Sequence, residues 1–127
     1  MKVLERGDAV PHFAVTTLEG RPVRYADLWQ RWNLVFAALP AEPGASDYVS
    51  ELTARIPDFV ELAAQLVLTR DTLPGLRSPG VLVADRWGEI VHVATASNTS
   101  DLPNAEALHE WLHWIETRCP ECEGETR

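Results

Sequence analysis

Uninterrupted apolar runs predict the strands of a central sheet. The run over 34–39 reads LVFAAL and contains no polar side chain, which is typical of a strand buried on both faces. Shorter apolar runs at 65–69, 81–84 and 89–94 predict three further strands, the last two as an antiparallel hairpin around Asp85–Gly88. We expect these strands to form one sheet with 34–39 in its interior.

Two shorter strands precede this sheet in the sequence. Residues 13–17 and 21–25 flank Glu19-Gly20, which is a turn signal between two extended segments. Residues 26–32 predict a short helical turn that leads into the 34–39 strand. The N-terminal part of the chain is therefore predicted to be a β-hairpin.

Helical periodicity predicts the remaining elements. Ser46 or Asp47 is in position to cap a helix, and Pro57 to start a second, short one. A final helix is predicted over 103–118. The apolar positions at helical spacing are Val49, Leu52, Thr53 and Ile56 in the first helix and Leu108, Trp111, Leu112 and Ile115 in the last.

Several short motifs before residue 40 resemble a known family. They are Gly7-Asp8, Pro11-His12-Phe13, Thr17-Leu18-Glu19-Gly20, Val23 and Ala26-Asp27-Leu28, followed by the apolar run 34–39. This series is similar to the start of the peroxiredoxin-like group (AhpC/TSA, redoxin) of the thioredoxin superfamily. The resemblance implies an α/β, thioredoxin-like fold, in which a central mixed sheet is flanked by helices and preceded by a β-hairpin.

The resemblance also makes Pro79 a candidate cis-proline that faces the redox turn. Only residues 70–78 separate the second central strand from Pro79. This segment is too short for the helix that the family places there. A shortened middle helix region and an edge-exposed domain are therefore expected.

The cysteines that the family uses at its active site are missing. Aligning Phe36 with the family's strand puts Ala41 and Gly44 at the two cysteine positions, with Pro43 retained. In the family's single-cysteine pattern, the position of the reactive cysteine is occupied by Asp47 or Tyr48. The loop Pro40, Ala41, Glu42, Pro43, Gly44 is thus interpreted as a vestigial active-site loop without a catalytic residue, in which Glu42 is a solvated acid and Asp47 a helix cap.

The only two cysteines, Cys119 and Cys122, lie in an acidic tail, 119–127, that follows a domain spanning 1–118. As a redox pair they would be slow, because the carboxyl end of a helix and the neighbouring glutamates disfavour thiolate. Alternatively, His109 and His113, at i and i+4, could join both thiols around zinc, which accepts this ligand set. The third interpretation is an inert tail, with no cofactor.

Composition narrows the class of function. The net charge of −8 argues against nucleic acid or an anionic membrane as a partner. No secretory signal is evident at the N-terminus, so a cytoplasmic location is expected. Trp87 and Trp114 are candidates for a protein interface, while the other tryptophans are expected to pack internally. The sequence favours a non-catalytic binding or accessory protein with a protein partner, leaves self-association open, and keeps a thiol-disulfide oxidoreductase using Cys119 and Cys122 as the alternative.

Overall fold

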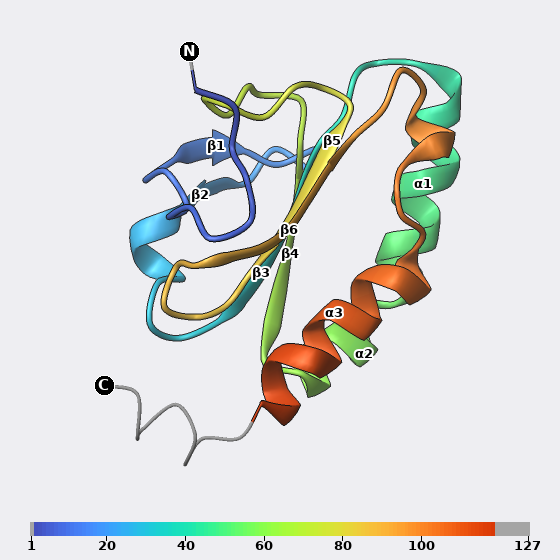
Figure 1. The fold of residues 1–127 in the computed structure, drawn as a ribbon. Coiled ribbons are helices and arrows are strands. Elements are labelled where there is room, and N and C mark those ends of the chain that lie inside the picture. Colours follow the sequence, from blue (N-terminus) through green and yellow to red (C-terminus); the bar gives the residue numbers. More distant parts are fainter. Residues whose placement is uncertain (1, 119–127) are drawn as a thin grey trace.

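The computed structural model describes residues 2–118 of the 127-residue chain (Figure 1). A strand pair comes first, a helix pair follows the third strand, and three further strands precede the last helix; short 3-10 turns lie before the third strand and before the last helix. In chain order the elements are β1 (Ala14–Thr16), β2 (Pro22–Arg24), η1 (Tyr25–Asp27), β3 (Asn33–Ala38), α1 (Pro43–Ala54), α2 (Ile56–Glu61), β4 (Ala64–Thr69), β5 (Gly80–Ala84), β6 (Ile90–Thr95), η2 (Thr99–Asp101) and α3 (Ala105–Thr117).

The central sheet has the strand order β4-β3-β5-β6. β3 pairs parallel with β4 and antiparallel with β5, so the sheet is mixed. Every residue of β3 is buried, as the apolar run at 34–39 predicts for an interior strand. The predicted position of the 34–39 strand inside the sheet is confirmed.

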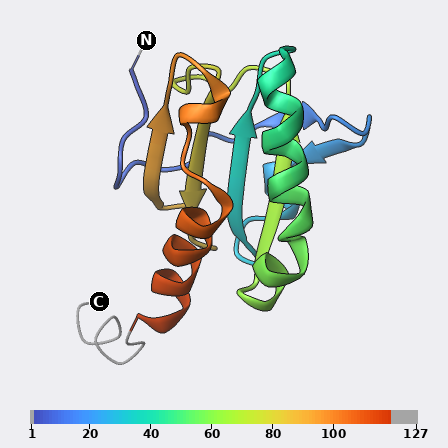
Figure 2. The ribbon, with the colours of Figure 1, turned by 90° about the vertical axis from the view of Figure 1, so that its right-hand side faces the viewer.

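Two layers cover opposite faces of this sheet (Figures 1 and 2). The three helices lie on one face, and the β1–β2 hairpin lies on the other. Alternate residues of β3 contribute to the two cores: Val35 and Ala37 pack toward the helices, whereas Leu34 and Phe36 pack toward the hairpin. Because both faces are covered, the sheet needs apolar residues at successive positions.

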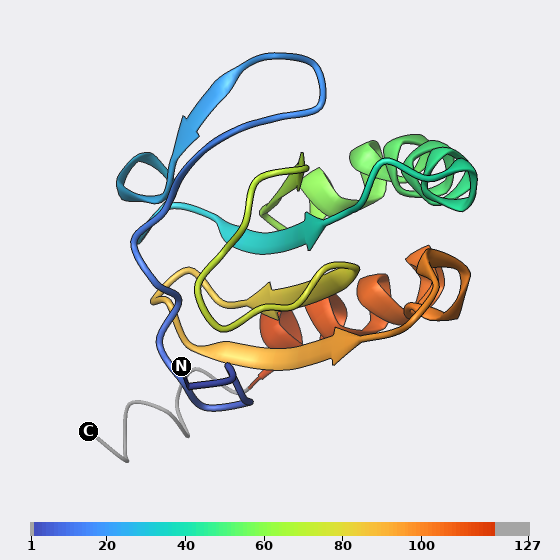
Figure 3. The ribbon, with the colours of Figure 1, turned by 90° about the horizontal axis from the view of Figure 1, so that it is seen from above.

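The two long edges of the sheet differ in what lies beside them (Figure 3). The N-terminal segment runs along β6, where Gly7 N donates to Ile90 O at 2.8 Å. The turn of the β1–β2 hairpin reaches the end of β4, where Leu18 N donates to Leu68 O at 2.9 Å. The rest of β4 is an edge of the sheet.

The first helix begins earlier than predicted. α1 starts at Pro43, with Glu42 as its N-cap residue in an extended conformation and no side-chain capping bond. Proline suits the first helical position because its φ is already helical and it has no N–H to leave unbonded. Ser46 and Asp47 therefore lie inside the helix, and the prediction that either caps it is wrong.

The buried face of this helix also differs from the prediction. Its buried residues are Ala45, Tyr48 and Leu52, whereas Thr53 and Ile56, expected on the apolar face, are exposed. The last helix agrees better with prediction. Its side chains at 108, 112 and 115 are buried, and Asn104 caps it by accepting a hydrogen bond from Ala107 N at 2.9 Å.

The connection between β4 and β5 contains no helix, as its length predicts. Residues 70–79 form a loop that is closed by a bridge between Leu73 and Leu76. Gly75 has a φ of +87°, and a Cβ there would lie 2.7 Å from Lys2 O, so this position requires glycine. The Ser78–Pro79 peptide bond is cis.

The tryptophans are less buried than expected. Trp87 and Trp114 are exposed, consistent with their interpretation as interface residues, but Trp29 is also 40% exposed. Trp32 and Trp111 are half-buried. The expectation that most tryptophans pack internally is wrong, since aliphatic and smaller aromatic residues fill both cores. Within residues 2–118, no helix has the length and hydropathy of a membrane span.

Candidate functional site

The vestigial loop connects the carboxyl end of β3 to the first turn of α1. Leu39 N donates to Thr69 O at 2.9 Å, which holds the start of the loop against the end of β4. Ala41 and Gly44, at the two expected cysteine positions, are both exposed. The scaffold therefore presents these positions to solvent at a helix N-terminus, where a thiolate would be stabilised, but it carries no thiol there.

Glu42 has a structural partner, so the interpretation as a freely solvated acid is wrong. Its carboxylate accepts hydrogen bonds from the Thr99 hydroxyl at 2.7 Å and from Thr99 N at 3.3 Å. Thr99 is fully buried at the start of η2. Glu42 thus joins the loop to the segment that leads into α3. The sequence separation of 57 residues hides this pair from sequence analysis.

Tyr48 occupies one of the alternative positions for a single cysteine. Its side chain is buried, and its hydroxyl donates to Pro103 O at 2.7 Å. Burial first, and then the nearby Glu51, raises the pKa of the Tyr48 phenol. The group is therefore a neutral hydrogen-bond donor that fixes α1 to the α3 approach, and is not an available nucleophile.

The cis-proline lies beside the end of β3. Gly80, the next residue, pairs with Ala38, and Ser78 Oγ donates to Ala38 O at 3.3 Å. Pro79 is buried, and its carbonyl accepts from Ala96 N at 3.2 Å. The loop before β5 and the vestigial loop thus meet the same end of the sheet.

A groove of about 500 Å³ adjoins the vestigial loop. Arg70, which directly follows β4, lies on its wall together with Leu18 from the hairpin turn. Neither residue was identified from the sequence as part of a site. The sequence position of Arg70 could have indicated that it belongs to the site. Arg70 directly follows β4, and the carboxyl ends of the parallel strands β3 and β4 meet at the same edge of the sheet. The full lining is Leu18, Leu39, Pro40, Ala41, Glu42, Pro43, Ala45, Ser46, Val49, Ser50 and Arg70.

The lining of this groove determines its chemistry. It offers one guanidinium, one carboxylate already bonded to Thr99, two serine hydroxyls and several apolar side chains. Among the described residues that line the groove, none carries a thiol or an imidazole. The described lining thus offers polar and apolar contacts, whereas peroxide reduction and disulfide exchange require a thiolate.

The predicted tail sites fall largely outside the described residues. Cys119 and Cys122 are beyond residue 118, so neither the redox pair nor the zinc site can be placed. His109 is half-buried and His113 exposed on α3. Within residues 2–118, no three metal-binding side chains lie close enough together to hold an ion.

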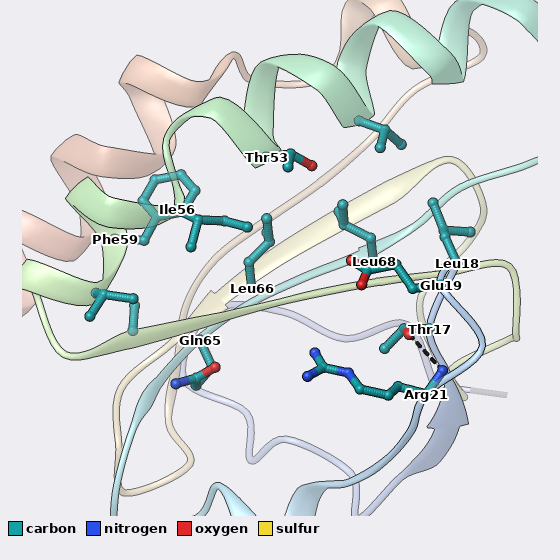
Figure 4. Close-up of a pocket in the computed structure, with 13 residues that line it drawn as sticks. Thr17, Leu18, Glu19, Arg21, Thr53, Ile56, Phe59, Gln65, Leu66 and Leu68 are labelled. Atoms are coloured by element: carbon teal, nitrogen blue, oxygen red, sulfur yellow. Dashed lines mark hydrogen bonds between the residues drawn. The ribbon is translucent and has the colours of Figure 1, made fainter.

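A second, smaller pocket of about 180 Å³ lies between the helices and β4 (Figure 4). Leu18 and Val49 line both this pocket and the groove at the vestigial loop. The two hollows are therefore neighbours along α1.

The sequence itself matches no protein-family model and no curated protein. Solved structures do match. AhpC from Mycobacterium tuberculosis superposes with a TM-score of 0.65 at 11% identity, covering 94% of this chain and 98% of that one. The thioredoxin domain of a thiol-disulfide oxidoreductase from Bacteroides vulgatus gives a TM-score of 0.64 at 13% identity and covers 88% of this chain and 99% of that one.

A third similar structure is the peroxidoxin BcpB from Mycobacterium tuberculosis, with a TM-score of 0.63 and 16% identity, covering 91% of this chain and 99% of that one. At these identities the similarity concerns the fold. The chain has the thioredoxin-like fold of peroxiredoxins and thiol-disulfide oxidoreductases, which confirms the fold implied by its N-terminal motifs.

Proposed function

We propose that this protein is a non-catalytic binding or accessory protein built on the thioredoxin-like fold. In this proposal the groove beside the vestigial loop receives part of a protein partner. The single observation that carries it is the hydrogen bonding of the loop itself. The acid between the two expected cysteine positions is bonded to the buried Thr99, and none of the residues within 2–118 that line the groove carries a thiol.

The composition of the groove supports a protein as its ligand. Its apolar side chains can bury a partner's apolar group, while Arg70 and the serines Ser46 and Ser50 supply polar contacts. The net charge of −8 disfavours nucleic acid and anionic lipid. We place the protein in the cytoplasm and assign it no cofactor.

An activity assay tests the non-catalytic part of the proposal. We expect peroxide reduction with a dithiol donor, and reduction of a disulfide substrate such as insulin, to stay at the uncatalysed rate. The same rate is expected for Cys119→Ser/Cys122→Ser, because the proposal assigns a catalytic role to neither cysteine. A positive control is a peroxiredoxin measured under the same conditions.

Two outcomes would contradict the proposal in different ways. Turnover by the unaltered protein that disappears in Cys119→Ser/Cys122→Ser would establish the alternative, a thiol-disulfide oxidoreductase working through its tail. Turnover that survives both substitutions would reveal a catalytic group other than a thiol.

A further inference from the structure

Among residues 2–118, the short β4–β5 connection leaves most of the outer edge of β4 without a neighbouring strand. Residues 70–79 contribute no strand or helix that could cover it. In the described part of the chain, the only bridge on this edge joins Thr17 to Thr69, at its far end. Exposed strand edges are sites at which another strand adds.

The hydrogen bonds of β4 identify which backbone groups point outward. Thr69 O accepts from Leu39 N and Ala63 O from Asn33 N, so these positions point toward β3. Leu68 O accepts from Leu18 N on the other side. Because backbone groups alternate in direction along a strand, Ala64 and Leu66 present their N–H and C=O groups to the open edge.

Exposed apolar side chains lie directly above this edge. Ile56 and Val60 of α2 are 38% and 46% exposed, and Leu18 of the hairpin turn is 36% exposed. All three line the pocket shown in Figure 4, where Leu66 and Leu68 form its floor. An apolar patch beside an unpaired edge indicates an interaction surface.

We propose that this surface pairs with a second copy of the chain through antiparallel association of the two β4 edges. Centring the two-fold axis on Gln65 places Ala64 of one copy opposite Leu66 of the other. Both such pairs are of the type that exchanges two N–H···O bonds. The arrangement is self-complementary, as a two-fold dimer requires.

The same symmetry brings the apolar patches together. Two sheets that continue across an edge keep their helices on one face, so Ile56 and Val60 of one copy approach those of the other. Paired edges alone are smaller than a stable interface, which buries about 1,200–2,000 Å². The contact between the two α2 helices supplies the apolar area that the strands lack.

The local charge permits this contact although the chain is acidic. Copies with a net charge of −8 repel one another over most of their surface. The charged residues lining this pocket are Glu19 and Arg21, which balance. Asp58, on the same helix as Val60, is paired with Arg55 at 2.7 Å. Glu61, at the end of α2, is exposed and adds a negative charge to this face, whereas the contact residues Ile56 and Val60 are themselves uncharged.

Sedimentation velocity over a range of protein concentrations tests the proposal. We expect a monomer–dimer equilibrium for the unaltered chain. Val60→Asp and Ile56→Asp should each raise the dimer dissociation constant about tenfold or more, because each places a charge in the apolar contact. The matched control is Val3→Asp, at an exposed position in the N-terminal segment beside β6, which should leave the constant unchanged.

Hydrogen exchange locates the contact independently of any substitution. Protection of the Leu66 amide should rise with protein concentration, and circular dichroism should confirm that the variants are folded. The proposal is overturned if the chain remains monomeric at every concentration. That result is expected if the β4 edge instead binds a strand of another protein. A dimer unaffected by both α2 variants, or one equally sensitive to Val3→Asp, also overturns the proposal. None of these results bears on the activity assay above.

Discussion

At the residue scale, the loop where the resemblance predicts an active site is held by structural hydrogen bonds. Glu42 lies between the two positions where the family carries cysteine, and its carboxylate holds the buried Thr99. Tyr48, at an alternative cysteine position, holds Pro103 O. Both contacts tie the start of α1 to the segment that precedes α3. The site residues thus contribute to stability in a place where related folds carry reactivity.

Replacing Glu42 by Ala should therefore destabilise the protein. The hydroxyl and amide of Thr99 would lose their acceptor in a buried environment, at a cost of about 1–3 kcal/mol in the free energy of unfolding. Urea denaturation followed by circular dichroism measures this cost. Glu110→Ala, at an exposed position on α3, is the control and should change stability little. Equal stability of Glu42→Ala and the unaltered protein would contradict the assigned role.

At the scale of elements, one polar cluster fixes the end of α3 to the sheet. Asp85, in the β5–β6 turn, accepts hydrogen bonds from Trp87 N and Glu89 N and from Arg118 Nη2 at 3.0 Å. Next to it, Glu116 of α3 accepts from Asn33 of β3 and from Arg86. The turn, the helix end and the start of β3 are thereby held together at the end of the sheet opposite the vestigial loop.

Substitution of Asp85 should destabilise the protein more than substitution of any other residue of this cluster, because its relative exposure is only 4%. Asp85→Ala removes the acceptor of both turn amides and the partner of Arg118, and should cost about 3 kcal/mol. Asp85→Asn keeps an acceptor for the amides and should cost less. Thermal and urea unfolding measure both variants. Equal losses would show that the charge, and not the turn geometry, carries the effect.

At the scale of the whole molecule, residues 2–118 contain both hydrophobic cores. The predicted domain boundary at residue 118 leads to a direct expectation. Deleting 119–127 should change the melting temperature little, and the purified protein should carry no stoichiometric zinc. Calorimetry and elemental analysis check the two statements.

The zinc hypothesis makes the opposite prediction for the same measurements. One zinc per chain, released by His109→Ala, His113→Ala or the deletion, would establish it, and bound metal would also raise the melting temperature. The affinity for the metal would then decrease at pH values below about 6, because imidazoles and thiols take up protons there. A large loss of stability on deletion without any metal would instead contradict the domain boundary.

Local sequence patterns were sufficient for much of the fold. The apolar run at 34–39 predicted an interior strand because a strand covered on both faces has apolar residues at successive positions. The length of 70–78 predicted the absence of a middle helix. The missing thiols at Ala41 and Gly44 could likewise be read from sequence position alone. Each inference depends on residues that are near one another in the chain.

Tertiary structure decided the contacts between distant segments. The buried face of α1, made of Ala45, Tyr48 and Leu52, and the Glu42–Thr99 pair both depend on where α3 and η2 lie against this helix. Burial of individual tryptophans and the open edge of β4 depend in the same way on which elements cover which surface. Sequence periodicity determines that a residue can face a core, whereas the neighbour that it meets there is set only when segments far apart in the chain pack together.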